Sequence, residues 1–150
     1  MLAPILGLGA NLIPLAAGLE VEFLGAWSVP LPLTAAALLA VGAGYGFGAW
    51  ALVENRFFSG TVRIQVERGH FVVDSGPYRF VRHPGYAGGL LMFAAAPLVY
   101  GVAWTGVFAG LICGVLVLRT ALEDRTLLEK LPGYREYAEK TRYRLVPGLW

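Results

Sequence analysis

Cysteine is almost absent from this chain of 150 residues: Cys113 is the only one, and it lies within an apolar run. A single cysteine excludes a disulfide or a multi-cysteine metal site within one chain. We therefore expect no metal centre, and we expect Cys113 to be a buried packing residue rather than a reactive thiol.

Charged residues are also scarce, at 15% of the chain, and long stretches contain none. Residues 1–19 and 23–53 carry no charged side chain, and between His83 and Leu118 only the histidine can be charged. Hydrophobic residues make up 57% of the chain, and the mean hydropathy is +0.60. This composition excludes an ordinary soluble domain and indicates an integral membrane protein.

The apolar runs predict the number of membrane spans, because a helix needs about 20 apolar residues to cross the hydrocarbon. The last run is too long for one span, and Pro97 and Gly101 interrupt it, so we interpret it as a hairpin of two spans. The fold class we expect is an all-α integral membrane protein of about four transmembrane helices, forming one domain over residues 1–150. The expected spans are residues 2–19, 33–53, 85–100 and 103–119.

The N-terminus lacks the basic region and the small-residue cleavage site of a secretory signal, so we expect its apolar run to be retained as structure. Glycines at positions 42, 44, 46 and 48 of the second span, and at 106, 110 and 114 of the last, predict closely packed helices.

Basic residues are confined to two segments: five of the twelve lie in 54–82 and seven in 119–150. With four spans, both segments fall on the same side of the membrane, and the positive-inside rule makes that side cytoplasmic. The net charge is only +2, and the basic residues alternate with acidic ones at the membrane borders. We therefore expect contacts with membrane lipids and no nucleic-acid partner.

Two glycine-rich stretches could be mistaken for a nucleotide-binding loop: "GAGYGFG" at 42–48 and "GLGAN" at 7–11. Neither completes the G-x-G-x-x-G pattern, and neither follows a strand of a soluble sheet. A Rossmann domain is therefore not expected. A nucleotide-like cofactor would have to bind to loops and helix ends at the membrane surface.

The loop before the third span, residues 54–84, is polar and stiffened by its own residues. It ends in "GPYRFVRHPGY" at 76–86, where Pro84 falls at the first position of a helix and forces His83 into an extended conformation. Backbone N–H groups just beyond His83 form a natural anion site. An interfacial histidine within a belt of tyrosines explains the same pattern.

The last span continues as a helix beyond the lipid until Pro132 and Gly133 end it. Arg119 and Glu123 are spaced i and i+4, so they share one helix face, which fits either a site or a surface ion pair. We define residues 120–150 as the C-terminal segment. It interleaves aromatic and basic residues and is expected to lie on the lipid headgroups.

Two separated motifs in these regions resemble a known family. "GHFVVDSGPYRFVRHPGYAG" at 69–88 and "RTALEDRTLLEKLPGYREYAEKTRYRLVPGLW" at 119–150 are similar to the isoprenylcysteine carboxyl methyltransferases and their phospholipid-methyltransferase relatives. The resemblance implies a multi-pass enzyme that uses S-adenosylmethionine without a Rossmann domain. It assigns the substrate carboxylate to Arg119, the expected catalytic residue. It assigns the cofactor to His70, Phe71, Val72, Val73, Tyr78, His83, Pro84, Gly85, Tyr86 and Glu123.

The resemblance leaves several points open. "LPGY" at 131–134 is one residue shorter than the matching stretch of the family's eukaryotic form, and without a gap there Asp124 would take the cofactor role of Glu123. The acceptor we expect is a lipophilic carboxylate such as that of a prenylcysteine. The alternatives are a phospholipid amine, an NADPH-dependent reductase of the membrane sterol type, which has a similar R-H-P-x-Y segment, and a scaffold without catalytic activity.

Overall fold

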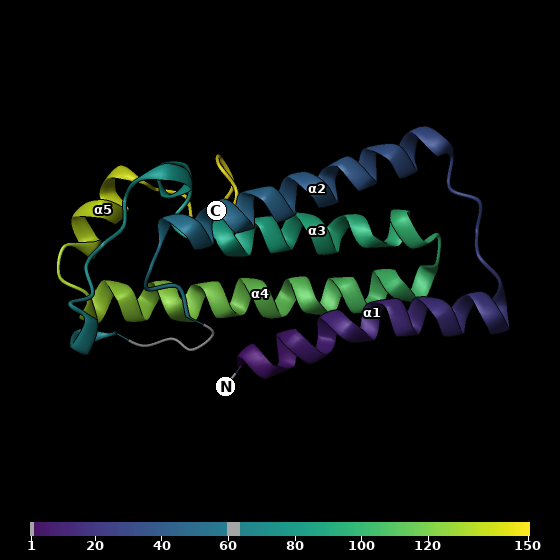
Figure 1. Cartoon of the computed structure of the whole chain (residues 1–150), viewed down its shortest axis with the longest axis horizontal. Helices are drawn as coiled ribbons and strands as arrows, with labels where there is room; N and C mark the ends of the chain where they lie inside the picture. Colours follow the sequence, from purple (N-terminus) through teal and green to yellow (C-terminus); the bar gives the residue numbers. More distant parts are fainter. Residues whose placement is uncertain (1, 60–63) are drawn as a thin grey trace.

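The chain is all-helical in a computed structural model that describes residues 2–59 and 64–150 (Figure 1), with side chains described from residue 11 onward. The described residues contain five α-helices, two short 3-10 helices and connecting loops, and no strand. The expected all-α fold class is confirmed. The helices are α1 (Leu2–Leu24), α2 (Leu31–Glu54), η1 (Val66–Arg68), η2 (Gly76–Arg79), α3 (Pro84–Tyr100), α4 (Ala103–Lys130) and α5 (Tyr134–Lys140).

Two of the described helices, α2 and α4, are long and apolar enough to cross a membrane, and α3 is a shorter apolar helix of 17 residues. The helices extend beyond the expected spans: α1 runs to Leu24, and α4 runs to Lys130, as the pattern before Pro132 predicts. Four crossings remain a prediction.

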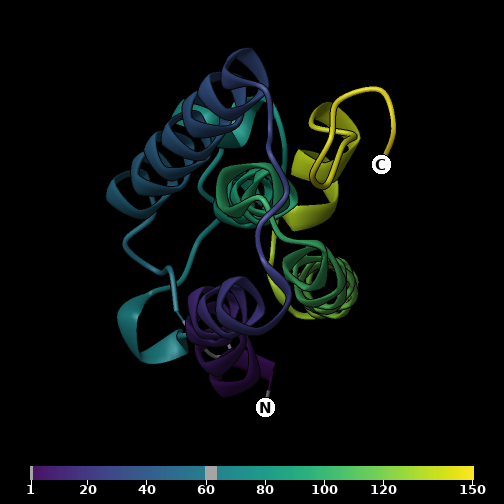
Figure 2. The same cartoon turned by 90° about the vertical axis from the view of Figure 1, so that its right-hand side faces the viewer.

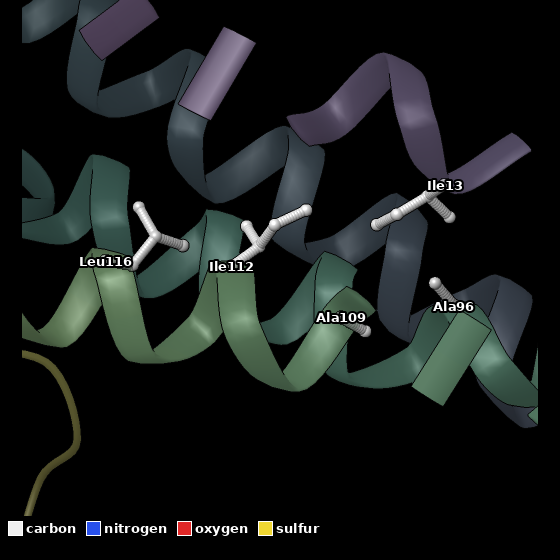
Figure 3. Close-up of a cluster of buried hydrophobic side chains, with 5 residues drawn as sticks. All are labelled: Ile13, Ala96, Ala109, Ile112 and Leu116. Carbon is white, nitrogen blue, oxygen red and sulfur yellow. The ribbon is translucent and has the colours of Figure 1, made fainter. Parts of the chain in front are cut away.

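The four long helices lie side by side along the longest axis of the molecule (Figure 1). Seen end-on, α3 is central, with α2 on one side and α4 on the other, while α1 packs against α4 (Figure 2). Small and branched apolar side chains fill the space between α1, α3 and α4 (Figure 3). This core consists of Ile13, Ala96, Ala109, Ile112 and Leu116.

Close packing between α2 and α3 depends on two glycines. A Cβ built on Gly44 would lie 2.6 Å from the Gly88 carbonyl oxygen, so neither position has room for a side chain. The glycine pattern of the second span thus does mark a close contact, although Gly42 and Gly46 face open space. In α4, a Cβ built on Gly110 or Gly114 would likewise meet no described atom within 4 Å, so the described part of the chain does not show the expected packing contact there.

The hairpin between α3 and α4 is closed by its own backbone and by α1. Gly101 ends α3 with a positive φ of 65°, and Pro97 lies inside α3 without ending it. The carboxylate of Glu20 accepts hydrogen bonds from the backbone N–H groups of Ala103 (2.9 Å) and Trp104 (2.8 Å). This contact satisfies two of the unpaired N–H groups at the start of α4 and fastens α1 to it.

At the opposite end of the bundle, α5 packs against the polar loop. The Tyr137 hydroxyl donates to the Tyr78 carbonyl oxygen (2.7 Å), and Tyr134 and Tyr137 are buried in a cluster with Ala51 and Leu131. The sequence suggested that these two tyrosines lie on the lipid headgroups. That expectation was wrong for them, because they form the core of the polar end. Headgroup contact by the rest of the C-terminal segment stays a prediction.

Candidate active site

The polar loop and α3 meet at His83, which precedes the first residue of the helix. Pro84 occupies the first helical position, as the sequence predicts. The expected extended conformation of His83 was wrong, because its φ of −127° is combined with a ψ of 63°, outside the extended region. The His83 carbonyl oxygen accepts the N–H groups of Tyr86 (3.1 Å) and Ala87 (3.0 Å). Pro84 therefore starts a regular helix that directs Tyr86, one turn later, toward α4.

Tyr86 connects α3 to the two residues singled out on α4. Its hydroxyl donates to Glu123 Oε2 (2.7 Å) and accepts a hydrogen bond from Arg119 Nε (2.6 Å). The Arg119 guanidinium also lies over the Tyr86 ring, 5.5 Å from its centroid, and its side chain is buried. The i, i+4 pair is therefore part of a partly buried network and not a surface ion pair.

A cavity of about 70 Å³ opens beside this network, between the end of α2, the polar loop, and the facing ends of α3 and α4. Among the described residues, its wall combines aromatic rings with one carboxylate and one guanidinium. The lining residues are Asn55, Phe57, Phe58, Ser59, Ile64, Tyr78, Arg82, His83, Gly85, Tyr86, Glu123 and Leu127.

Behind the cavity, Asp124 is fully buried and accepts hydrogen bonds on both carboxylate oxygens. Oδ1 receives Arg82 Nε (2.8 Å) and the Tyr134 hydroxyl (3.0 Å), and it lies 3.2 Å from His83 Nε2. Oδ2 receives Arg82 Nη2 (2.9 Å) and Arg144 Nε (2.7 Å). These contacts hold together the polar loop, α4, α5 and the C-terminal segment.

The Asp124 carboxyl is ionised in this setting. It lies beyond residue 119, where the expected span ends. Burial acts to raise the pKa of the Asp124 carboxyl, but hydrogen bonds from His83, Arg82 and Arg144 outweigh burial and hold that pKa well below its usual range. Two cations thus neutralise a carboxylate that would otherwise be costly to bury.

The hydroxyl of Tyr78 remains protonated, because here burial outweighs the hydrogen bond. Burial raises the pKa of Tyr78 to about 12, although the hydrogen bond from the Asn55 side chain (3.1 Å) opposes this shift. In the cavity wall Tyr78 is therefore a neutral donor and acceptor.

Several expected cofactor residues line the cavity together: Tyr78, His83, Gly85, Tyr86 and Glu123. Pro84 is buried at the start of α3, and Arg119 contacts the cavity through Tyr86. Asp124, the alternative to Glu123, is not among the lining residues. The roles of all these residues stay predictions.

The stretch His70–Val73 does not line the cavity. The His70 ring lies against Phe57 with 4.4 Å between ring centroids, and Phe71 meets the same ring edge-on. Val72 and Val73 pack against the buried tyrosine cluster of Tyr78, Tyr134 and Tyr137. These four residues support the wall from behind, and their expected cofactor contact remains a prediction.

Sequence reasoning missed much of the cavity wall, above all Asn55, Phe57 and Phe58, which follow α2. No motif marks them, because they reach the cavity only through the turn after α2. It also missed the pairing of Arg82 with Asp124. A signal did exist there, since each is a charged residue next to a singled-out one, His83 or Glu123.

The family is decided by a comparison with family models. The model of the isoprenylcysteine carboxyl methyltransferase family matches residues 33–129, well over half of the chain. The chain belongs to this family. The match covers α3 and nearly all of α2 and α4, and so includes every described residue that lines the cavity. In this methyltransferase-family chain, α5 and the residues after it lie outside the match. Membership of the family, together with the two candidate spans, indicates a membrane protein.

Proposed function

We propose that the protein transfers a methyl group from S-adenosylmethionine to a carboxylate of a lipophilic, prenylcysteine-like acceptor at the membrane surface. The observation that carries this proposal is the Tyr86 hydroxyl, which joins Arg119 and Glu123 beside the cavity. Arg119, whose cation suits the acceptor carboxylate, and Glu123, whose carboxylate suits a cationic group of the cofactor, thus lie on one helix face.

The cavity wall fits the chemistry of this cofactor. Glu123 offers a carboxylate to an ammonium group or to ribose hydroxyls, and the rings of Phe57, Phe58 and Tyr86 offer faces to a cationic centre. Gly85 adds no side chain, and a Cβ there would lie 2.8 Å from Phe58 Cε2. Ligand cavities typically hold about 300–1,000 Å³. Because this one is smaller, side chains such as Phe58 must move for the cofactor to enter.

Arg119 is placed to hold the acceptor. It lies one helical turn before Glu123, on the side nearer the lipid-spanning part of α4. A guanidinium can grip a carboxylate with two parallel hydrogen bonds, which fixes the attacking oxygen in line with the methyl group. Arg119 is therefore expected to orient the acceptor without forming a covalent bond.

No general base is needed for a carboxylate acceptor, because a carboxyl group is already deprotonated near pH 7. S-adenosylmethionine supplies an electrophilic methyl group on a sulfonium when it is bound. A low dielectric beside the aromatic rings of the wall would favour a step in which two opposite charges disappear.

An amine acceptor is the second candidate, and one observation favours it. Methylation of an amine releases a proton, so it requires a proton acceptor. Asp124 already receives hydrogen bonds from two guanidinium groups and a hydroxyl, whereas Glu123 lines the cavity and receives the Tyr86 hydroxyl. Glu123 would accept the released proton in that reaction.

We also propose that α1 to α4 each cross the membrane and that the cavity faces the cytoplasm. The charge distribution supports this arrangement, because both basic segments lie at the cavity end of the bundle. A soluble cofactor would then reach the cavity from the cytoplasm, and a lipid-dissolved acceptor would reach it from the bilayer.

Transfer of a labelled methyl group tests the function directly. The purified protein in lipid nanodiscs is incubated with methyl-tritiated S-adenosylmethionine and with S-farnesylcysteine, S-geranylgeranylcysteine or total phospholipid. A methyl ester releases its label as methanol in base, whereas an N-methylated amine keeps it, so the label identifies the acceptor class. Absence of transfer, with NADPH bound in calorimetry, would indicate a reductase. If no methyl group is transferred and calorimetry detects binding of neither S-adenosylmethionine nor NADPH, the protein would be a scaffold and the proposal would be contradicted.

A further inference from the structure

A chain of contacts leads from the C-terminal segment into the cavity wall, beginning at Trp150. The backbone oxygen of Trp150 accepts hydrogen bonds from the N–H groups of Arg144 (2.9 Å), Leu145 (3.0 Å) and Val146 (3.2 Å), which closes residues 144–150 into a loop. The Arg144 guanidinium carbon lies 4.9 Å from the centroid of the Trp150 ring. Trp150 therefore fixes both the backbone and the side chain of Arg144.

The Arg144 side chain that Trp150 fixes is in turn hydrogen-bonded to Asp124. Its Nε donates to Oδ2 at 2.7 Å, and the Asp124 side chain is completely buried while that of Arg144 is about one-third exposed. The other oxygen of Asp124 contacts the side chains of Arg82 and His83, which both line the cavity. The Asp124 carboxylate thus connects the Arg144 side chain of the C-terminal segment to two side chains of the cavity wall.

The same segment also holds the backbone of the wall. The N–H of Arg82 donates to the Tyr143 carbonyl oxygen (2.9 Å), and the N–H of His83 donates to that of Arg144 (3.0 Å). Arg82 Nη1 donates to the carbonyl oxygens of Thr141 (2.9 Å) and Arg142 (2.7 Å). The backbone of residues 82–83 and the side chain of Arg82 are therefore attached to residues 141–144.

These contacts also determine the tautomer of His83. Asp124 is flanked by two guanidinium groups, so its carboxylate is ionised and can only accept hydrogen bonds. The Tyr134 hydroxyl already donates its proton to Asp124 Oδ1. The His83 Nε2, 3.2 Å from the same oxygen, must therefore carry the ring proton and donate it.

We propose that Trp150, Arg144 and Asp124 are positioning residues that fix the orientation and tautomer of His83 in the cavity wall. None of the three is among the residues that line the cavity, so they act on a bound molecule only through His83 and Arg82. The link to cofactor affinity rests on the proposed function. The positioning of His83 can be measured without any cofactor.

The chain offers a matched pair of variants for this test. Arg144→Gln removes the cation that contacts Asp124, whereas Arg142→Gln removes an exposed cation two residues earlier whose side chain makes no contact with Asp124 among the described residues. The chain has only two histidines, so ¹⁵N-histidine labelling gives ring signals for His83 and His70 alone. His70 serves as an internal reference, since its Nδ1 accepts the Gln65 N–H (3.3 Å) in a separate contact.

In the wild-type protein we expect the His83 ring to be protonated at Nε2 and that proton to exchange slowly, because the ring is buried. In Arg144→Gln the His83 ring nitrogens should shift and the Nε2 proton should exchange faster, while the His70 signals stay in place. Arg142→Gln should match the wild type. Arg144→Lys keeps the charge without the guanidinium fork and should restore the wild-type signals in part.

Binding provides the functional measurement. The dissociation constant of S-adenosylhomocysteine, measured by calorimetry, should rise roughly 2- to 30-fold in Arg144→Gln and remain unchanged in Arg142→Gln. KM for S-adenosylmethionine should rise by a similar factor, with kcat at saturation little changed. A role limited to stability would lower the melting temperature and leave the His83 signals and the affinity unchanged.

If Arg144→Gln does not fold, Trp150→Ala replaces it, because it removes only the ring against Arg144 and should shift the His83 signals in the same direction by less. Unchanged His83 signals in the folded variant would overturn the proposal, as would equal shifts in Arg142→Gln. If the His83 signals shift as expected but the wild type binds neither S-adenosylmethionine nor its product, the positioning role stands and the proposed function fails.

Discussion

At the scale of single residues, Glu123 contributes to the cavity wall mainly through its charge. Replacing it with glutamine keeps its size and its ability to accept the Tyr86 hydroxyl, which now lies 2.7 Å from Oε2. A hydrogen bond to a charged group contributes about 1.5–3 kcal/mol, so we expect Glu123→Gln to weaken S-adenosylmethionine binding roughly 10- to 100-fold. Isothermal calorimetry on the protein in detergent measures this change.

Glu129→Gln is the matched control for this variant. Glu129 lies on the same helix and loses the same charge, but its side chain is 49% exposed and pairs with Arg125 at 2.8 Å. Its binding constant should equal that of the wild type. A wild-type affinity in Glu123→Gln would remove Glu123 from the cofactor site.

Arg119 should affect turnover more than cofactor affinity, because its proposed partner is the acceptor. Arg119→Ala removes both the cation and the hydrogen bond to Tyr86 (2.6 Å), and misplacing the acceptor should lower kcat by about 100-fold. Arg119→Lys keeps the charge and should recover only part of the rate, since a lysine lacks the two-pronged grip. Methyl-transfer kinetics with a prenylcysteine acceptor provide kcat and the KM for S-adenosylmethionine.

The exposed Arg125 supplies the control, because Arg125→Ala removes a cation from the same helix away from the cavity. The assignment would be wrong if Arg119→Ala kept the wild-type kcat and lost only affinity for S-adenosylmethionine.

The sequence could identify the polar side chains of the site but not the rings that enclose them. His83, Tyr86, Arg119 and Glu123 are polar residues at the borders of apolar runs, and such residues are visible in any reading of the chain. Phe57 and Phe58 are not, because two phenylalanines after a hydrophobic helix resemble ordinary packing residues. Only the path of the chain after α2 places them against Tyr78 and Gly85.

At the scale of helices, the contact between α2 and α3 depends on the absence of two side chains. A Cβ on Gly88 would collide with the Gly44 carbonyl oxygen and would lie 2.9 Å from Gly48 N, and neither backbone atom can move independently. Overpacking of this kind costs about 1–3 kcal/mol, so Gly88→Ala should lower the melting temperature. Thermal unfolding in detergent, followed by circular dichroism, measures it.

Gly46→Ala is the comparison within α2, because a Cβ at Gly46 meets no atom within 4 Å in the part of the chain that the structure describes. Alanine also favours a helix over glycine by up to about 1 kcal/mol, so this variant should be as stable as the wild type or more stable. Equal melting temperatures for Gly88→Ala and Gly46→Ala would contradict the close contact.

Helix limits were predictable from the sequence where proline, glycine and charge mark them. The starts of α3 and α4 and the end of α4 fall within two residues of the expected positions, because Pro84, Gly101 and Pro132 act through local backbone geometry. The fold of the C-terminal segment was not predictable. Tyr134 and Tyr137 pack against residues far away in the chain, and an interleaved aromatic and basic pattern looks the same on a membrane surface as in a small buried core.

At the scale of the whole molecule, the all-α class follows from the length of the uncharged runs, since a stretch of about 20 apolar residues crosses lipid as a helix. The orientation of the bundle is a separate matter, and it can be tested because both ends carry exposed residues. Ser28 lies in the connection between α1 and α2, and Lys140 lies at the end of α5, at opposite ends of the bundle (Figure 1).

Replacing Cys113 with alanine gives a background without cysteine, into which Ser28→Cys or Lys140→Cys introduces a single exposed thiol. A maleimide that cannot cross membranes should label Ser28→Cys in intact cells and label Lys140→Cys only after permeabilisation. The reason is that all twelve basic residues lie in 54–82 and 119–150, on the side that we assign to the cytoplasm. Labelling of both thiols in intact cells would contradict the four crossings. The reverse pattern would keep the crossings but place the cavity outside, away from a cytoplasmic cofactor.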